Sequence, residues 1–273
     1  MLVYKALRSR SINIFLWMRY TTKSIFSKNK VVNKDAVSSL IKSFAPITTD
    51  KELIRIGPDM DGGYLVPDAL EGIKICFSPG VGMYSGFEKE LADRGMEVYM
   101  ADASVEAPQI SHKRFHFVKK FIGKNTEGEF ITVSDWVAEM VGDKENDMLL
   151  QMDIEGYEYD AFDAMSEQFL SRFRIVIIEL HSLYKFWEPE FYKRFVKLRD
   201  KLFSHHICVH LHPNNCCGIF TFKGVKIPRA LEITLIKKDK VTLSTPAQQF
   251  PHNLDQDNTP LRSISLPEDW IGQ

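Results

Sequence analysis

The stretch from Leu149 to Glu158 combines an apolar run with acidic side chains. Asp153 and Glu155 come directly after the apolar residues, and Gly156 follows them. Such a run is typical of a buried strand, and open α/β sheets bind ligands at the carboxyl ends of their strands. A carboxylate in that position can accept a proton from a reacting hydroxyl group. We therefore predict that Asp153 acts as a base or contacts the group that reacts, and that Glu155 orients Asp153.

A second apolar run ends in the same way. Residues 173–181 form the most apolar strand pattern in the chain, and they finish with Glu179 and His181. The ends of neighbouring parallel strands meet at one sheet edge, so these groups could converge on one cleft. These acids also have structural explanations that need no catalysis. Acids such as Glu155 are favoured where a helix starts, and Glu179 could pair with a nearby Lys or Arg. The predicted catalytic residues are Asp153, Glu155, Glu179 and His181.

His210 and His212 lie two residues apart in a further strand pattern, so their side chains share one face. Together with Asp153, Glu179 and His181 they could hold a divalent ion, which would lower the pKa of an acceptor hydroxyl. Histidines at this spacing are also common without a metal. The sequence therefore leaves a metal site as the less favoured alternative.

A glycine turn and a downstream acid indicate a cofactor site. The turn 78–86 follows a short strand pattern, and a helix pattern comes after it. This arrangement lets a ligand approach the backbone closely at a helix N-terminus. Asp102 ends the next strand pattern, where a carboxylate can accept the hydroxyl groups of a ribose. The predicted cofactor-binding residues are Ser78, Gly80, Gly82, Tyr84, Asp102 and Ala103.

Strand and helix patterns alternate along most of the chain, which predicts a parallel, doubly wound α/β sheet. No helix separates the last two strands, so we expect them to form an antiparallel pair. A Gly-Gly turn within residues 55–67 predicts a β-hairpin or a loop over a ligand. The predicted strands are 73–77, 97–102, 115–118, 147–153, 173–181, 207–212 and 230–236. The predicted helices are 31–54, 132–141 (capped by Thr132 or Ser134), 160–170 and 188–204.

The composition narrows the class of protein. The 273 residues are 44% hydrophobic and carry a net charge of −1, which allows a large core and argues against a nucleic-acid partner. The four cysteines form no CxxC pair, which favours a reducing compartment, and we expect a cytoplasmic protein.

Residues 1–30 contain seven basic residues, no acid and a short apolar patch. They could form a surface helix, or a basic amphipathic helix in peripheral contact with the inner face of a membrane.

These patterns resemble the class I S-adenosylmethionine-dependent methyltransferases. The segment Asp153-Ile154-Glu155-Gly156-Tyr157-Glu158 is similar to the D-x-E-G-x-E signature of the FkbM-type family. Three further segments resemble a subset of that family. They are Asp61-Gly62-Gly63-Tyr64, His212-Pro213-Asn214-Asn215 and Pro251-His252-Asn253-Leu254-Asp255. The chain departs from the methyltransferase pattern at Ser78, where an acid is usual, and at Tyr84, where a third glycine is usual.

The resemblance implies a Rossmann-like methyltransferase fold, with a seven-stranded, mostly parallel sheet and a terminal antiparallel strand pair. It implies S-adenosylmethionine as cofactor and methyl transfer to a hydroxyl group on a sugar, a glycan or a small metabolite. We expect a basic N-terminal helical extension over residues 1–50 and the methyltransferase domain over 51–243. Residues 244–273 should be an irregular C-terminal segment that packs on the domain or is disordered.

Two other functions fit the same sequence. Gly80, Gly82 and Asp102 also suit a nicotinamide-dependent oxidoreductase, although no hydride-transfer site is evident. A non-catalytic, membrane-associated scaffold on a methyltransferase fold is the second alternative, which the departures at Ser78 and Tyr84 motivate. The sequence leaves the oligomeric state open.

Overall fold

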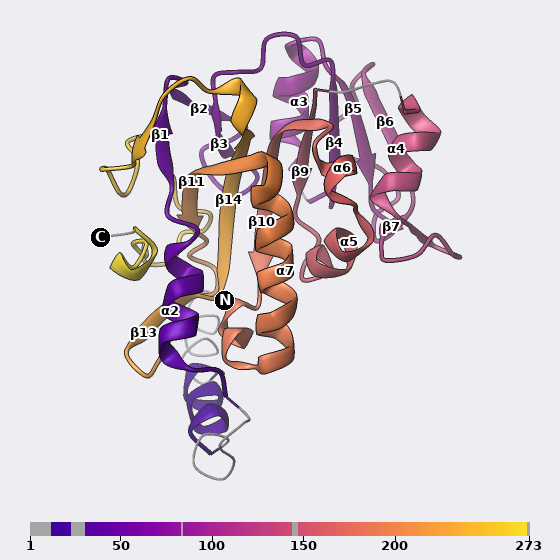
Figure 1. Cartoon of the computed structure of the whole chain (residues 1–273). Helices are drawn as coiled ribbons and strands as arrows, with labels where there is room; N and C mark the ends of the chain where they lie inside the picture. The colour runs from indigo at the N-terminus through magenta and orange to yellow at the C-terminus, as the bar shows by residue number, and fades with distance from the viewer. Residues whose placement is uncertain (1–11, 23–30, 83, 144–146, 272–273) are drawn as a thin grey trace.

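A seven-stranded sheet forms the centre of the computed structural model, which describes residues 12–22, 31–82, 84–143 and 147–271 (Figure 1). Strand β14 runs antiparallel to both of its neighbours, and the other adjacent pairs are parallel. The predicted sheet and its antiparallel end are thus confirmed. In spatial order the strands are β11 (His206–Pro213), β14 (Ala230–Lys237), β10 (Phe173–His181), β9 (Met148–Met152), β4 (Ile75–Pro79), β5 (Glu97–Ala101) and β6 (Phe115–Val118).

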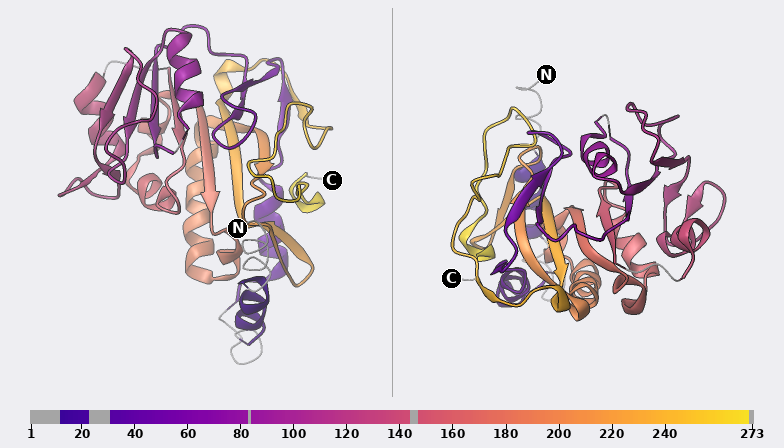
Figure 2. Two further views of the ribbon diagram at one scale, coloured as in Figure 1. Left: turned by 180° about the vertical axis from the view of Figure 1, so that it is seen from behind. Right: turned by 90° about the horizontal axis from the view of Figure 1, so that it is seen from above.

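Both faces of the sheet are covered, which explains why its central strands are mostly apolar. Leu150 of β9 packs into the core beneath the helices α2, α4, α5 and α7, whereas its neighbour Leu149 packs into the core beneath α3 and the β2–β3 hairpin. Figure 2 shows these two layers on opposite sides of the sheet when the molecule is viewed from above. Strands buried on both faces read as continuous apolar runs. The helices are α2 (Lys34–Lys42), α3 (Gly86–Asp93), α4 (Val133–Val141), α5 (Glu158–Ala164), α6 (Glu167–Leu170) and α7 (Pro189–His205).

Two helix predictions need correction. The helix expected over residues 31–54 ends with α2 at Lys42, because Pro46 and the β-branched residues after it favour the strand β1 (Ile47–Thr49). The helix expected over 160–170 is split into α5 and α6. Met165 adopts an extended conformation between them, and the Ser166 side chain accepts a hydrogen bond from the Phe169 N–H at the start of α6. The predicted cap of α4 is confirmed, since the Thr132 hydroxyl accepts a hydrogen bond from the Asp135 N–H at 3.0 Å.

Four small two-stranded sheets surround the central one. The predicted hairpin is confirmed as β2 (Leu53–Ile56) paired with β3 (Tyr64–Pro67), whereas the other three sheets were not predicted. In two of these three sheets the paired strands are close in the sequence, and in the third they are far apart in the sequence. They are β7 (Phe121–Ile122) with β8 (Phe130–Ile131), β12 (Ile219–Phe222) with β13 (Val225–Pro228), and β1 with β15 (Ser244–Pro246).

The C-terminal residues cross the sheet face at the end that carries β11 and β14. Strand β15 pairs with β1, and the fully buried Trp270 in the short helix η3 (Glu268–Trp270) donates a hydrogen bond to the Lys226 carbonyl. Asn258 donates hydrogen bonds to Glu232 at 2.5 Å and to Asp61 at 3.4 Å. The segment thus joins residues of the hairpin and the sheet that are far apart in the sequence.

Residues 12–22 form a helix whose two sides differ. Leu16 and Tyr20 pack into the main core, and Tyr20 donates a hydrogen bond to Glu188 at 2.9 Å. The outward side carries large apolar residues that are at least half exposed, namely Ile14, Phe15, Trp17 and Met18. In the part of the chain that the structure describes, no helix has both the length and the apolar character needed to cross a bilayer.

Candidate active site

A tight turn follows β4 and approaches the end of β9. Gly80 has φ +92°, and a Cβ atom added to it would lie 1.7 Å from the Asp153 carbonyl oxygen. Only glycine fits such a position, because a side chain would clash with backbone and the positive φ disfavours other residues. The Gly80 N–H donates to the Ala101 carbonyl at 3.0 Å. The turn is therefore locked between β5 and the end of β9.

Asp102, at the end of β5, holds the same turn with its side chain. One carboxylate oxygen accepts the Val81 N–H at 3.0 Å, and the other accepts the Ser104 N–H at 2.7 Å. The Ser104 hydroxyl also donates to this second oxygen, at 2.6 Å. The oxygen that accepts the Val81 N–H therefore keeps a lone pair for a ligand hydroxyl. This arrangement places an anchored acid beside the glycine turn.

A cavity of about 420 Å³ lies over the turn and the ends of β4, β5 and β9. Its size and its mainly apolar wall suit a small organic ligand. Gly82 borders open space, since no atom lies within 4 Å of the position that its Cβ would take. The lining residues are Gly80, Val81, Gly82, Ala101, Asp102, Ser104, Phe121, Ile122, Phe130, Asp153, Ile154, Glu155 and Tyr157.

Three of the predicted cofactor residues lie outside this lining. Tyr84 is 69% exposed, and Ala103 is partly buried beside the cavity rim. Ser78 is fully buried below the turn, where its hydroxyl lies 2.6 Å from both Glu88 and Gln151. Burial raises the pKa of Glu88, so a protonated Glu88 can donate to Ser78, and Ser78 can donate to Gln151. This buried chain supports the turn from within.

Asp153 connects the cavity with a second group of ionisable residues. Its side chain is mostly buried, and its Oδ1 accepts no hydrogen bond from any residue that the structure describes. Burial raises the pKa of Asp153 to about 7, although the nearby His181 opposes the shift. A carboxylate with this pKa is matched to proton transfer near neutral pH.

His181 is oriented by Glu158, which the sequence analysis did not single out as a site residue. The imidazole Nδ1 lies 2.9 Å from Glu158 Oε1, and the same oxygen accepts the backbone N–H of Gly156 at 3.0 Å. Glu158 is fully buried at the start of α5, whereas the Glu155 side chain is 86% exposed. Burial lowers the pKa of His181, but the bond to Glu158 and the surrounding carboxylates outweigh it and raise the pKa to about 9. His181 is therefore protonated at neutral pH, which no sequence pattern indicated.

The other nitrogen of His181 faces the predicted carboxylates. Its Nε2 lies 3.9 Å from Asp153, 3.5 Å from Glu155 and 3.6 Å from Glu179. The structure thus brings together all four predicted catalytic residues. Burial and the nearby Asp153 raise the pKa of Glu179, which accepts a hydrogen bond from Asn214 at 2.8 Å.

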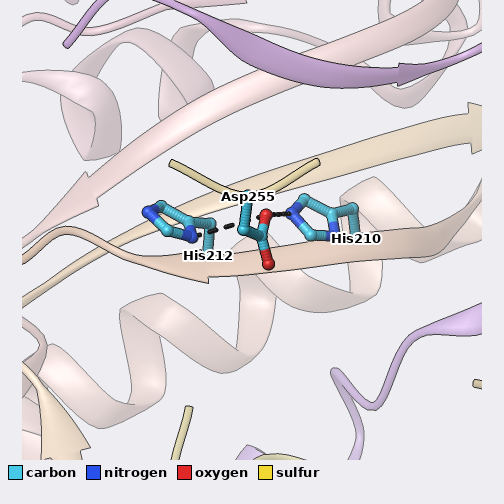
Figure 3. A group of neighbouring side chains, drawn as sticks. All are labelled: His210, His212 and Asp255. Atoms are coloured by element: carbon cyan, nitrogen blue, oxygen red, sulfur yellow. Dashed lines mark ion pairs between the residues drawn. The ribbon is translucent and has the colours of Figure 1, made fainter. Parts of the chain in front are cut away.

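Four of the five residues predicted as metal ligands fall into two separate groups, and Glu179 belongs to neither. Asp153, Glu155 and His181 offer ligand atoms within 4.8 Å of one another. His210 and His212 instead form a group with Asp255, at the same spacing (Figure 3). Asp255 lies in the Pro-His-Asn-Leu-Asp segment that was noted in the sequence, but only the fold reveals its partners.

Residues 80–205 match the family described as the methyltransferase FkbM domain. No curated protein sequence matches the chain. The match covers the glycine turn, Asp102 and the strand ends that carry Asp153, Glu179 and His181. It therefore spans the cavity and the ionisable group described above.

Three solved structures are similar to this chain at low sequence identity. The 23S rRNA methyltransferase ErmE is 11% identical over 79% of this chain and 72% of its own, with a TM-score of 0.36. A methyltransferase from an antibiotic biosynthesis pathway of Anabaena variabilis is 13% identical over 52% and 60%, with a TM-score of 0.32. A 1,6-didemethyltoxoflavin-N1-methyltransferase from Burkholderia thailandensis is 16% identical over 60% and 71%, with a TM-score of 0.31. The family match confirms the resemblance seen in the sequence: residues 80–205 are similar to the methyltransferase FkbM domain.

Proposed function

We propose that the protein transfers a methyl group from S-adenosylmethionine to a hydroxyl group of its acceptor. The observation that supports this most directly is the buried Oδ1 of Asp153, which accepts no hydrogen bond from the described residues and lies beside the cofactor-sized cavity. A hydroxyl group needs a base when it attacks a methyl group, and an unpaired carboxylate oxygen can accept its proton.

The cavity residues fit S-adenosylmethionine, which would supply the methyl group on its sulfonium sulfur. Asp102 would bind a ribose hydroxyl, because its carboxylate is anchored by Val81 and Ser104 and the oxygen beside Val81 keeps a free lone pair. Phe121 and Phe130 form apolar walls on which an adenine ring can pack. Gly80 and Gly82 leave room for the ligand next to the backbone.

The ionisable group would then act on the acceptor. Asp153 accepts the hydroxyl proton, and the positive charge of His181 favours the ionised state that Asp153 needs. Glu158 positions His181 through its hydrogen bond to Nδ1. The carboxyl groups of Asp153, Glu155 and Glu179 can also accept hydrogen bonds from neighbouring hydroxyls, which favours a sugar, a glycan or another polyhydroxylated metabolite as the acceptor.

Calorimetric titration with S-adenosylmethionine and, separately, with NADH tests the cofactor. We expect S-adenosylmethionine to bind and Asp102→Asn to weaken its binding. Asparagine can accept the Val81 N–H but not the Ser104 donors as well, so circular dichroism should verify that the variant is folded. Binding of NADH alone would favour an oxidoreductase instead. Binding of neither would favour the non-catalytic scaffold.

We also propose that the outward side of the helix 12–22 contacts the inner face of a membrane peripherally. Four large apolar side chains are exposed there, within a stretch of sequence that is rich in Lys and Arg and has no acid. Such helices lie in the interfacial plane of anionic bilayers. The enzyme would then work in the cytoplasm close to that surface.

A further inference from the structure

His210 and His212 point from one face of β11 toward the C-terminal segment. They are two residues apart, and their rings are nearly parallel with centroids 6.5 Å apart (Figure 3). An irregularity in the pairing of β11 with β14, between Cys208 and His210, comes directly before them. Both histidines are buried.

Asp255 completes the group from the opposite side. Its Oδ2 accepts the His252 N–H at 2.8 Å, which fixes the orientation of the carboxylate. Its Oδ1 then lies between the two rings, 2.9 Å from His210 Nε2 and 3.5 Å from His212 Nδ1. The side chain of Asp255 is only 9% exposed.

The contact between Asp255 and His210 does not have hydrogen-bond geometry. Both His210 Nε2 and Asp255 Oδ1 are buried, and neither has a hydrogen-bond partner among the described residues. An ordinary anchoring pair would form a hydrogen bond at 2.9 Å. Atoms that bind the same metal ion lie about 3 Å apart, but they point toward the ion and not toward each other.

We propose that His210, His212 and Asp255 bind a divalent transition-metal ion of the Zn²⁺ class. Two imidazole nitrogens and one carboxylate oxygen are ligands that such ions prefer, and three protein ligands leave a position for water. Cavities adjoin the group on two sides. One of about 620 Å³ is lined by His210, and another of about 220 Å³ is lined by His212 and Asp255, so an ion and its water can enter.

The ion would fasten the C-terminal segment to the sheet. Asn258 lies three residues after Asp255 and donates hydrogen bonds to Glu232 and Asp61. Glu232 is the partner of both Glu179 and His212 in the strand register. The metal site would therefore set the position of a segment beside the proposed acceptor site, while remaining separate from the group around Asp153.

Calorimetric titration of the metal-stripped full-length protein with ZnCl₂, and with MgCl₂ in parallel, tests this proposal. We expect one Zn²⁺ per chain and no comparable binding of Mg²⁺. Asp255→Asn keeps an oxygen that can accept the His252 N–H but loses the charge, and should weaken Zn²⁺ binding by at least about 100-fold. The matched control Asp257→Asn, two residues further along the same segment, should bind like the parent protein.

Two further measurements identify the ligands. The ring ¹⁵N resonances of His210 and His212 should shift on addition of Zn²⁺, which reports ligation in the folded parent protein without any variant. Glu155→Gln should retain the Zn²⁺ ion. No Zn²⁺ binding by the parent protein, or binding that Glu155→Gln abolishes and Asp255→Asn does not, would overturn the proposal.

Discussion

His181 Nδ1 lies 2.9 Å from Oε1 of Glu158, and this pair links the start of α5 to the end of β10. The same Glu158 oxygen accepts two backbone N–H groups, from Ile154 and Gly156. Glu158 is thus held in place at the start of α5, where its bond to the imidazole raises the pKa of His181. The acid–base properties of the candidate active site depend on this pair.

The substitution Glu158→Gln should lower the pKa of His181 from about 9 toward its ordinary value, because the imidazolium loses its buried carboxylate partner. NMR titration of the histidine resonances measures this shift. We expect kcat to fall by about 10²-fold. Glutamine can still accept the backbone N–H groups, so the fold should persist. Glu167→Gln, an exposed acid in the first turn of α6, is the matched control, and an unchanged His181 pKa in Glu158→Gln would contradict the pairing.

Methyl transfer should depend on pH through Asp153. The carboxylate must be ionised to accept a proton, and its pKa is raised to about 7, so kcat/KM should be low in acid and rise through about pH 7. Asp153→Asn should reduce kcat by about 10²–10⁴-fold. Calorimetry should find that this variant still binds S-adenosylmethionine. Full activity of Asp153→Asn would exclude Asp153 as the base.

Two neighbouring glycines should respond differently to alanine. Gly80→Ala would force a Cβ atom against the Asp153 carbonyl at a positive φ, and should lower the free energy of unfolding by more than about 3 kcal/mol. Gly82→Ala meets no atom within 4 Å and should change the stability little. Denaturant unfolding of both variants measures the difference. Equal stability losses would show that the turn is not constrained by contact with β9.

Asp147 should stabilise the protein only above acidic pH. Hydrogen bonds from Arg174, at 3.1 and 2.7 Å, and from Lys240, at 3.1 Å, lower the pKa of Asp147 to about 2. The carboxylate therefore contributes stability above its unfolded pKa, and this contribution is lost as the pH falls toward 2. Asp147→Asn should cost about 1–2 kcal/mol at pH 7, after allowance for partial exposure.

Unfolding measured across this pH range tests the Asp147 prediction. The difference between Asp147→Asn and the parent protein should shrink steadily from pH 5 to pH 2. Asn suits the φ of +70° at this position as well as Asp does, so backbone strain should not contribute. A difference that is independent of pH would mean that the ion pairs are not its source.

The exposed side of the helix 12–22 should determine vesicle binding. We expect the parent protein to sediment with vesicles of phosphatidylcholine and phosphatidylserine, and less with phosphatidylcholine alone. Phe15→Glu combined with Trp17→Glu should abolish sedimentation without unfolding, because both residues are at least half exposed. Leu243→Glu, an exposed apolar residue elsewhere, is the control. Sedimentation that survives the double substitution would contradict membrane contact by this helix.

The sequence predicted the parts of the fold that local patterns determine. Strands β9 and β10 are buried on both faces, so they appear as unbroken apolar runs, and the acids that end them identify the active edge of the sheet. Helix α7 was predicted to within one residue at each end, because its apolar residues have a regular helical spacing and Pro189 marks its first turn. These features depend on neighbouring residues alone.

The missed features depend on contacts between distant residues. Glu158 reads as an ordinary acid at a helix start, and its role at His181 becomes visible only when β10 lies beside β9. Ser78 suggested a cofactor contact, but its bonds to Glu88 and Gln151 follow from burial beneath the turn. Asp255 is 43 residues from His212, in a stretch without a periodic pattern, so no spacing rule could join them.

The pairing of Asn258 with Asp61 has a consequence for synthesis of the chain on the ribosome. The glycine turn, Asp102 and Asp153 are all made before residue 160, but β10, α7 and β14, which complete the same core, are made later. Asn258 bonds to both Asp61 and Glu232, and it lies 197 positions after Asp61. These contacts cannot form until Asn258 has emerged. The contact between Asn258 and Asp61 would thus be among the last parts of the fold to form during synthesis.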